Sequence, residues 1–353
     1  MERQRGENPN PSPAAAGGIS ALRQRWAARL EGLGGRKVLL RSFLRRYGTV
    51  IGGVLIFIGF SLSTPYFFTV HNFLLMLKQM SMLTILSLGF TFVMGAGGFD
   101  MSIGYAVGLV SVFLGSVLNL GGLHFAIPAA LLTGLVIGAI NGLLVAYLRL
   151  PDFIATFAVG SIAFGAKMLY TKGHPVFLRN SPEAFDFIGQ GSLGPIPFPV
   201  IIMLALLGVT LIVLNRTRFG KHIYAIGGNP QAALYVGINI RFYRFLTFII
   251  SGLSIAITAI VLTSRLGSAQ PQAGEAYLLD VFAVCFLSTT MFGEGEPTAA
   301  GAFVGALIIT MLNSGLIMLN VPYHIQYITK GVVVILAIML SVALGQRARL
   351  KIF

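Results

Sequence analysis

The sequence predicts an all-helical protein that crosses a membrane about ten times, and three observations support this prediction. Of the 353 residues, 56% are hydrophobic and only 10% are charged, which is more apolar surface than a soluble domain can bury. Apolar runs of about 20 residues, long enough to span the hydrocarbon core of a bilayer, recur along the chain. No segment has the alternating apolar and polar pattern of a transmembrane β-strand.

The composition also narrows the chemistry of the chain. The 43 glycines suit helices that pack closely in lipid. The only cysteine, Cys285, lies in an apolar segment and cannot form an intramolecular disulfide. The five histidines show no metal-ligand spacing, so we expect no metal site. No GxxxxGK[ST] phosphate loop is present, so this chain is not expected to bind or hydrolyse ATP itself.

Residues 1–47 are predicted to form a cytoplasmic N-terminal tail. The first 18 residues are rich in Pro, Ala, Gly and Asn, a composition typical of disorder. Five apolar residues then recur at helical spacing: Ile19, Leu22, Trp26, Leu30 and Leu33. This pattern predicts an amphipathic helix on the inner leaflet, or a soluble tail that has the pattern by chance. No small-residue cleavage site follows the first apolar run, so no removable signal peptide is predicted.

Residues 48–345 are predicted to form the transmembrane domain, with residues 346–353 as a short C-terminal tail. The expected spans lie near 49–64, 73–95, 101–120, 123–148, 152–172, 196–215, 242–266, 275–292, 298–320 and 323–345. An even number of spans places both termini on the same side of the membrane. Residues 172–196 then form the longest loop on the other side, where they either meet an external binding protein or only link two helices.

The basic residues indicate which side is cytoplasmic. The formal net charge is +14, and ten of the 25 basic residues precede Gly48 while three follow Gly345. Lys and Arg beside membrane spans mark the cytoplasmic face, so both tails are predicted to be cytoplasmic. The excess charge therefore indicates a membrane surface rather than nucleic acid as the acidic neighbour.

A polar segment of residues 215–244, which we call the basic segment, separates two long apolar runs. It contains five basic residues and no acid: Arg216, Arg218, Lys221, Arg241 and Arg244. The same charge rule places its loop, residues 216–241, on the cytoplasmic side. All three basic clusters of the chain therefore agree on one topology.

A short helix is predicted over residues 230–236 within the basic segment. Asn229 suits the N-cap, Pro230 suits the first helical position and Gly237 suits the stop. Ala232 and Ala233 would give this helix a small face that could lie in a groove of a partner. The alternative is an ordinary basic loop.

The intramembrane motif GAGGFDMSIG, residues 95–104, places Asp100 among four glycines. A carboxylate at the centre of a membrane helix costs about 2.5 to 3.5 kcal/mol on insertion scales. The glycines permit a broken helix, which membranes tolerate where it is buried in protein or lines a cavity. Asp100 is therefore expected either to accept hydroxyl groups of a solute or to cap the following helix.

Three further polar residues lie within apolar segments. Asn141 and Asn313 are expected either to hydrogen-bond between helices or to face a polar path. Thr156 is expected to bond to its own helix.

Several of these motifs resemble the permeases of ABC importers of the ribose and simple-sugar family. The passages that carry the resemblance are GGNPQAALYVGI (227–238), GAGGFDMSIG (95–104), INGLLVAYLRLPDFIATFAVG (140–160), SRLGSAQPQAGEAYLLD (264–280) and GAFVGALIITMLNSGLIML (301–319). The second is similar to the GGIDLSVG signature of that family. The likeness extends over about residues 65–344, which is nearly the whole membrane portion.

The resemblance implies the fold of a type II ABC importer and a set of functional residues. The ATPase-coupling residues would be Gly227, Gly228, Asn229, Pro230, Gln231, Ala232, Ala233 and Gly237. The substrate-pathway candidates are Asp100, Ser102, Asn141, Thr156 and Asn313. The chain would translocate a monosaccharide or a sugar-like solute across the bacterial cytoplasmic (inner) membrane.

The resemblance also implies partners. These are an ABC ATPase subunit that binds ATP, a periplasmic or lipid-anchored solute-binding protein, and a second permease subunit in a homodimer or heterodimer. Two other classes remain as alternatives. An ion-coupled secondary transporter of a small polar solute would need paired acids and bases in the membrane, and apart from Asp100 the helix interiors are expected to offer few. A membrane enzyme would need clustered His and Asp at one face, and no such cluster is present.

Overall fold

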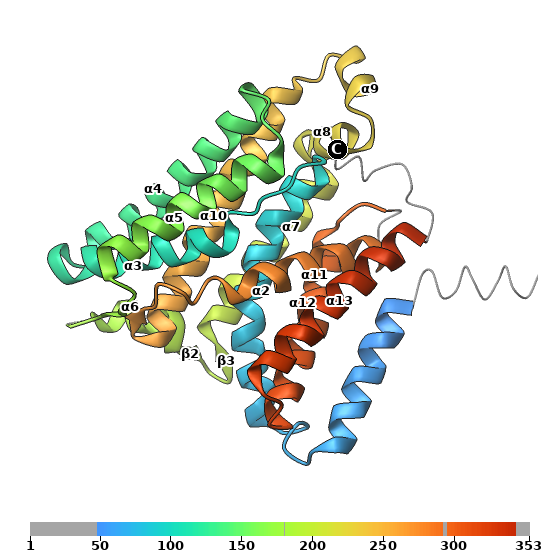
Figure 1. Cartoon of the computed structure of the whole chain (residues 1–353). Helices are drawn as coiled ribbons and strands as arrows, with labels where there is room; N and C mark the ends of the chain where they lie inside the picture. The colour runs from blue at the N-terminus through green and yellow to red at the C-terminus, as the bar shows by residue number, and fades with distance from the viewer. Residues whose placement is uncertain (1–47, 180, 292–294, 344–353) are drawn as a thin grey trace, which may run out of the picture. The chain divides into compact units, whose positions relative to one another are not determined.

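The computed structural model describes residues 48–179, 181–291 and 295–343. Each of the ten predicted spans coincides with a helix (Figure 1). These helices are Gly48–Ser63, α2 (Val70–Gly95), α3 (Ile103–Gly121), α4 (Leu123–Gly142), α5 (Asp152–Thr171), α7 (Phe198–Arg216), α10 (Ile240–Leu266), α11 (Ala276–Met291), α12 (Ala299–Met318) and α13 (Tyr323–Ala343). A π-helical turn, η1 (Leu143–Tyr147), continues α4. The predicted tails, with the amphipathic helix, lie outside the described residues.

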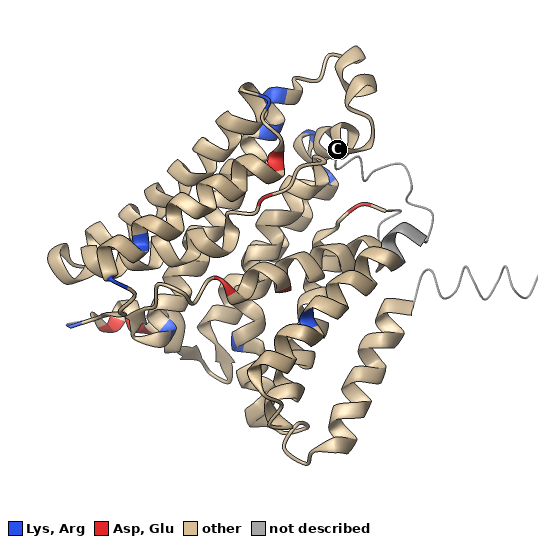
Figure 2. Ribbon diagram, viewed as in Figure 1, with Lys and Arg blue, Asp and Glu red and all other residues tan. Residues whose placement is uncertain are grey.

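Seven of the described helices are long and apolar enough to cross a membrane, counting α4 and η1 together. Three shorter apolar helices complete the set: Gly48–Ser63, Ala276–Met291 and Tyr323–Met339. Figure 2 shows how few charged residues these helices contain. The all-helical architecture with about ten helices is therefore confirmed.

Side-chain caps determine where several helices begin. The hydroxyl of Thr69 accepts a hydrogen bond from the Asn72 N–H at the start of α2, and Thr298 accepts one from the Gly301 N–H at the start of α12. Such a cap satisfies one of the four N–H groups that a helix leaves without an internal partner. At the other end, Gly267 adopts a φ of 62° directly after α10, a left-handed conformation that suits glycine.

Helix α10 is the centre of the packing and contacts α2, α3 and α4. Its backbone lies directly against that of α4, because a Cβ added at Gly252 would overlap the carbonyl oxygen of Gly134. A Cβ added at Gly138 would likewise overlap the carbonyl oxygen of Phe248. Close approach of two backbones at small residues is the usual way in which helices associate in lipid.

The predicted outer loop, residues 172–196, is more structured than a simple linker. It contains helix α6 (Glu183–Gln190) and the strands β1 (Val176–Phe177), β2 (Ser192–Leu193) and β3 (Ile196–Pro197). Strand β1 pairs antiparallel with β4 (Ser268–Ala269), and β2 pairs with β3. Helix α6 is fastened to the end of α10, where Ser264 Oγ accepts a hydrogen bond of 2.7 Å from the Gly189 N–H.

The basic segment forms two helices, α8 (Arg218–Gly228) and α9 (Pro230–Tyr235). Gly227 and Gly228, expected in a loop, are therefore the last turn of α8. The structural reason is that α8 has apolar side chains to bury almost to its end: Ile223, at 0% exposure, lies in the main hydrophobic core, and Ile226, at 1%, packs with Ala233 and Ile238.

Candidate functional site

Helix α9 has the predicted capped structure. Asn229 Oδ1 accepts a hydrogen bond of 3.1 Å from the Ala232 N–H, and Pro230 occupies the first helical position. After the helix, Gly237 adopts a φ of 81°. This conformation strains any side chain, so a glycine stop is required there.

The face that α9 presents to solvent differs from the predicted one. Ala233 is buried at 3% exposure and packs against Ile226 and Ile238, so the expected small face of Ala232 and Ala233 is wrong for Ala233. The reason is that α9 is so short that its packing depends on the side chain that points inward. Ala233 is that side chain, and its small size lets α9 lie close to α8. The exposed face at the end of α9 is formed by Leu234 and Tyr235 together with Val236, which follows the helix directly, at 63%, 89% and 74% exposure.

Helix α8 connects this exposed face to the membrane helices. A Cβ added at Gly227 would overlap the carbonyl oxygen of Gly95, so the last turn of α8 touches the end of α2. The Tyr224 hydroxyl donates a hydrogen bond of 2.8 Å to the carbonyl oxygen of Pro297, just before α12. Burial, with a contribution from the nearby Glu296 carboxylate, raises the pKa of Tyr224 above its usual value, so this hydroxyl remains a donor at any physiological pH.

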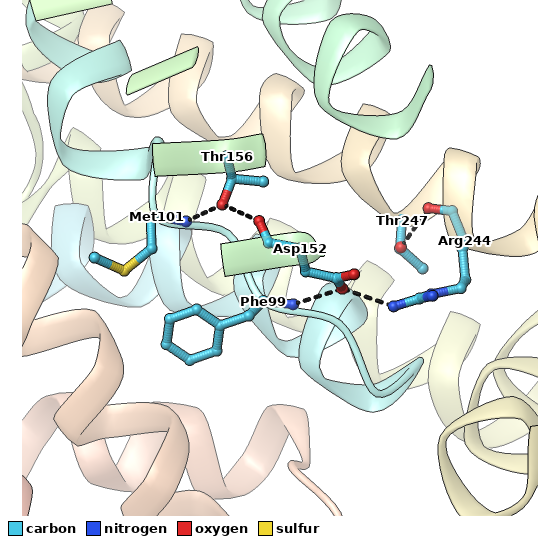
Figure 3. A network of polar contacts seen from close by, with 6 residues as sticks. All are labelled: Phe99, Met101, Asp152, Thr156, Arg244 and Thr247. Carbon is cyan, nitrogen blue, oxygen red and sulfur yellow. Dashed lines mark hydrogen bonds and ion pairs between the residues drawn. The ribbon is translucent and has the colours of Figure 1, made fainter. Parts of the chain in front are cut away.

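Between α2 and α3 the chain is not helical, and we call residues 96–102 the broken segment. Figure 3 shows how α5 holds it: Asp152 Oδ2 accepts a hydrogen bond of 3.2 Å from the Phe99 N–H. Thr156 Oγ1 accepts one of 2.9 Å from the Met101 N–H and donates one of 2.7 Å to the Asp152 carbonyl oxygen. The predicted bond of Thr156 to its own helix is confirmed, and the same hydroxyl also supports the broken segment.

Arg244 joins this network from the end of the basic segment. Its Nη2 donates to Asp152 Oδ2 at 2.6 Å, and the two side chains are 25% and 18% exposed (Figure 3). A single carboxylate oxygen therefore binds both the first turn of α10 and the backbone of the broken segment. From the sequence, Arg244 was predicted only to mark the cytoplasmic side, and Asp152 had no predicted role. The sequence feature that could have pointed to Asp152 is its position as an acid at the start of an apolar helix, directly after Pro151.

Asp100 is the centre of a second, fully buried network. Its Oδ1 accepts hydrogen bonds from the Ser102 N–H (2.9 Å), the Ser102 hydroxyl (2.6 Å) and the Asn141 amide (3.4 Å). Its Oδ2 accepts one of 2.8 Å from the Ser251 hydroxyl. The four residues of this network are each at most 1% exposed: Asp100, Ser102, Asn141 and Ser251. Asp100 thus caps the bend before α3 rather than the first turn of α3, and Asn141 makes the expected bond between helices.

Four of the five pathway candidates therefore lie together, and Asn313 lies apart from them. The Asn313 amide donates to Asp280 Oδ2 at 3.1 Å, and Lys330 Nζ donates to the same oxygen at 2.9 Å. Asp280 Oδ1 and Asn313 Oδ1 have no hydrogen-bond partner among the described residues. This cluster joins α11, α12 and α13.

A further buried cation lies on α5. Lys167 has a side-chain exposure of 0% and donates to Glu275 Oε1 at 3.1 Å. Together with the pairs of Arg244 and Lys330, this gives three ion pairs among the described residues. Only Asp280 and Lys330 pair from within two helices, because Asp152 begins α5 and Glu275 precedes α11, so the expectation of few paired acids and bases in the helix interiors stands. The partners are far apart in sequence, for example by 108 residues for Lys167 and Glu275, and no local pattern could reveal them.

Comparison with known proteins identifies the family. Residues 72–340 match the family model described as branched-chain amino acid transport system / permease component. The chain is 34% identical over 308 residues to the ribose import permease protein RbsC of Haemophilus influenzae, covering 86% of this chain and 95% of that protein. It is 32% identical over 304 residues to the D-allose transport system permease protein AlsC of Escherichia coli, covering 85% and 92%.

A third relative is the galactose/methyl galactoside import permease protein MglC of Haemophilus influenzae. The identity is 34% over 294 residues, covering 78% of this chain and 87% of that protein. These matches confirm the resemblance found in the sequence motifs and decide against the ion-coupled transporter and the membrane enzyme. The chain belongs to the branched-chain amino acid transport system / permease component family of ABC importer permeases.

Proposed function

We propose that this chain translocates a monosaccharide or a sugar-like solute into a bacterial cell. The relatives named above are permeases for ribose, allose and galactose or methyl galactoside, and they cover most of the chain. As a permease component, the chain is not itself the ATPase, and ATP is bound by a separate subunit of the importer. A solute-binding protein delivers the solute, and a second permease subunit, identical or different, completes the path.

The proposed orientation places both termini and helices α8 and α9 in the cytoplasm of the inner membrane. The clustering of Lys and Arg at these places supports it. The fold is consistent with this arrangement, because α6, β1 and β4 then all lie on the outer side, where they contact the end of α10 or each other.

The observation that carries the proposal is the exposed apolar face of α9. Leu234 and Tyr235 at the end of this short capped helix, and Val236 directly after it, are each more than half exposed. Large apolar side chains gathered on one polar-flanked surface mark a protein interaction site, and Tyr is a frequent anchor residue. We assign this face to the ATPase, with the residues 227–233 and Gly237 setting its shape and position.

Two routes can carry a movement of α9 into the membrane. One passes through α8 to the end of α2 and, by the Tyr224 bond, to the start of α12. The other passes from α9 into α10, where Arg244 binds Asp152 and through it the broken segment. ATP-driven movement of the ATPase would thus reach the residues around Asp100. Alternating access follows if the inward-open and outward-open states of the permease differ in the conformation of the broken segment.

In this proposal Asp100 acts through the backbone that it organises. Two of its four hydrogen bonds, from Asn141 and Ser251, tie the broken segment to α4 and α10, and the other two come from Ser102 within that segment. We assign Ser102 and Asn141 the same supporting role. Thr156 supports the same backbone from α5. Asn313 would act at a different place, between α11 and α13.

The test replaces Tyr235 by Ala and measures how much ATPase subunit copurifies with the permease. Loss of an anchor aromatic costs about 2 kcal/mol or more of binding free energy, so retention should fall at least about tenfold. Tyr66→Ala is the matched control, because Tyr66 is 71% exposed but lies at the other end of the bundle. Ala232→Trp should also weaken docking, since it adds bulk beside the anchor. Full retention in both α9 variants would remove the main structural ground for the proposal.

A further inference from the structure

Helix α13 carries two kinds of exposed side chain, on different sides. Ile328 and Ile335 are seven residues apart and share one side of the helix, where both are well exposed. Tyr323, Tyr327 and Lys330 follow each other at spacings of four and three residues and share another side. Aliphatic side chains suit lipid tails, whereas an ammonium group within a membrane helix needs protein or water around it. The side of α13 that carries Lys330 therefore faces away from lipid.

Along this second side, exposure falls steadily toward the interior. Tyr323 and Tyr327 are 75% and 49% exposed, whereas the side chains of Lys330 and Asp280 are 14% and 8% exposed. Lys330 Nζ lies 5.8 Å from the ring centroid of Tyr327 and donates to Asp280 Oδ2 at 2.9 Å. About 10 Å of helix separates Tyr323 from Lys330. The two tyrosines thus line an entry that leads from the start of α13 to a buried carboxylate.

Two buried oxygen atoms at the end of this entry accept no hydrogen bond. Asp280 Oδ2 accepts from Lys330 and from the Asn313 amide, but Asp280 Oδ1 and Asn313 Oδ1 have no donor among the described residues. A buried acceptor without a donor destabilises the protein that contains it. Because Lys330 already balances the charge of Asp280, the group that these oxygens lack is a neutral donor rather than a second cation.

A sugar supplies donors of this kind. Asp280 and Asn313 are joined by a hydrogen bond of 3.1 Å, so hydroxyl groups on neighbouring carbons of one molecule can donate to the unpaired oxygen of each. The ammonium group of Lys330 has three N–H donors, and those that Asp280 leaves free can donate to a hydroxyl oxygen. A few convergent polar groups at the end of an accessible entry are typical of a small-molecule site.

We propose that Asp280, Asn313 and Lys330 bind hydroxyl groups of the solute, which reaches them past Tyr323 and Tyr327. The Lys330 side chain closes this hydroxyl site in the present conformation, and its flexible four-carbon stem lets it move aside. The identity of the solute rests on the proposed function, whereas the entry and the hydroxyl site are properties of this chain alone.

The first test asks whether water reaches the entry. Tyr327→Cys and Ile328→Cys are made singly in the full chain in lipid nanodiscs, and the rate of reaction with a charged thiol reagent is measured. The two positions are adjacent and lie at the same depth, and Ile328 is the more exposed of the two, at 65%. A charged reagent avoids lipid, so Tyr327→Cys should react at least about tenfold faster. Equal rates, or a faster Ile328→Cys, would overturn the entry. The unaltered chain, whose Cys285 is buried, gives the background rate.

The second test asks whether a sugar protects Tyr327→Cys from the reagent. Ribose, allose and galactose are added in turn, since a sugar bound beside Lys330 covers position 327. At about ten times its Kd, a bound sugar should slow the reaction about tenfold. Asn313→Leu, which is similar in size but has no polar atom, should raise the Kd about tenfold, so the same concentration should slow the reaction only about twofold.

Thr329→Val is the matched control for the protection assay. The exposed Thr329 hydroxyl lies next to Lys330 in the sequence but bonds only to the Ile325 carbonyl oxygen, so protection should stay at about tenfold. If Asn313→Leu changes the rate without sugar as much as it changes protection, Asn313 only supports the fold and the proposal is wrong.

Protection by none of the three sugars would overturn the hydroxyl site, whatever the importer transports. Uptake of the labelled sugars by the assembled importer tests the proposed function separately. Protection without uptake would count against sugar transport and leave the hydroxyl site standing.

Discussion

The ion pair between Arg244 and Asp152 should be necessary for coupling ATP hydrolysis to solute movement. Arg244 lies near the start of α10, the helix that follows α9, and Asp152 accepts a hydrogen bond from the Phe99 N–H of the broken segment. Replacing Arg244 by Gln removes the charge that orients Asp152 while it keeps much of the side chain's length. We expect the ATPase to remain bound, because the exposed face of α9 is unchanged, and the stimulation of ATP hydrolysis by loaded binding protein to fall.

The size of the effect follows from the exposure of the pair. Exposed ion pairs contribute about 0.2 to 1 kcal/mol, and breaking a buried pair costs about 3 to 5 kcal/mol. With side chains that are 25% and 18% exposed and a separation of 2.6 Å, an intermediate cost of about 1.5 to 3 kcal/mol applies here. At about 1.4 kcal/mol for each factor of ten, the stimulated rate should fall roughly 10- to 100-fold.

The assay uses the assembled importer in proteoliposomes and measures basal and stimulated ATP hydrolysis and uptake of labelled ribose. Arg241→Gln is the matched control, since Arg241 is exposed and belongs to the same basic segment. The double variant with Arg244→Asp and Asp152→Arg should recover part of the stimulation. Full stimulation in Arg244→Gln, with normal amounts of permease, would refute the coupling role of this pair.

Three further predictions concern topology, packing and the broken segment. In intact cells, Asn229→Cys should resist an impermeant thiol reagent while Ser192→Cys reacts, and external labelling at position 229 would contradict the topology. Gly252→Ala should destabilise the fold by about 1 to 3 kcal/mol because its Cβ meets a carbonyl oxygen of α4, whereas Gly165→Ala, which meets nothing within 4 Å, should be tolerated in thermal unfolding. Asp100→Asn should retain more uptake than Asp100→Leu, because Asn keeps one acceptor oxygen; wild-type uptake by the Leu variant at normal protein levels would exclude a role for Asp100.

Much of the fold could be predicted from the sequence because the membrane restricts it so strongly. Apolar runs of the required length located the helices, and cap residues such as Asn229 and Gly237 located α9 to within one residue at its end. Local signals of this kind need no knowledge of distant parts of the chain. The inward turn of Ala233 was missed because it depends on Ile226 and Ile238, which meet only in the folded structure.

The ion pairs were missed for a related reason. Lys167 lies in an otherwise apolar stretch. The residues around it in the sequence do not reveal that Glu275 and the Tyr105 carbonyl oxygen lie beside its ammonium group. Sequence patterns report the neighbours within one helix, whereas these contacts depend on how separate helices pack. The same limit applies to Asp152, whose importance follows only from its two partners outside α5.

The buried polar residues share one physical task. Lipid offers no hydrogen bonds, so each interruption of a helix leaves N–H groups that protein atoms must satisfy. At the broken segment, Asp152, Thr156 and Asp100 accept the N–H groups of Phe99, Met101 and Ser102 in turn. Arg244 of α10 pairs with Asp152, and Asn141 of α4 and Ser251 of α10 donate hydrogen bonds to Asp100, which ties the break to those helices. A movement of α10 therefore cannot leave the broken segment unaffected, and this is why the places where helices are interrupted are also the places where we expect transport to be controlled.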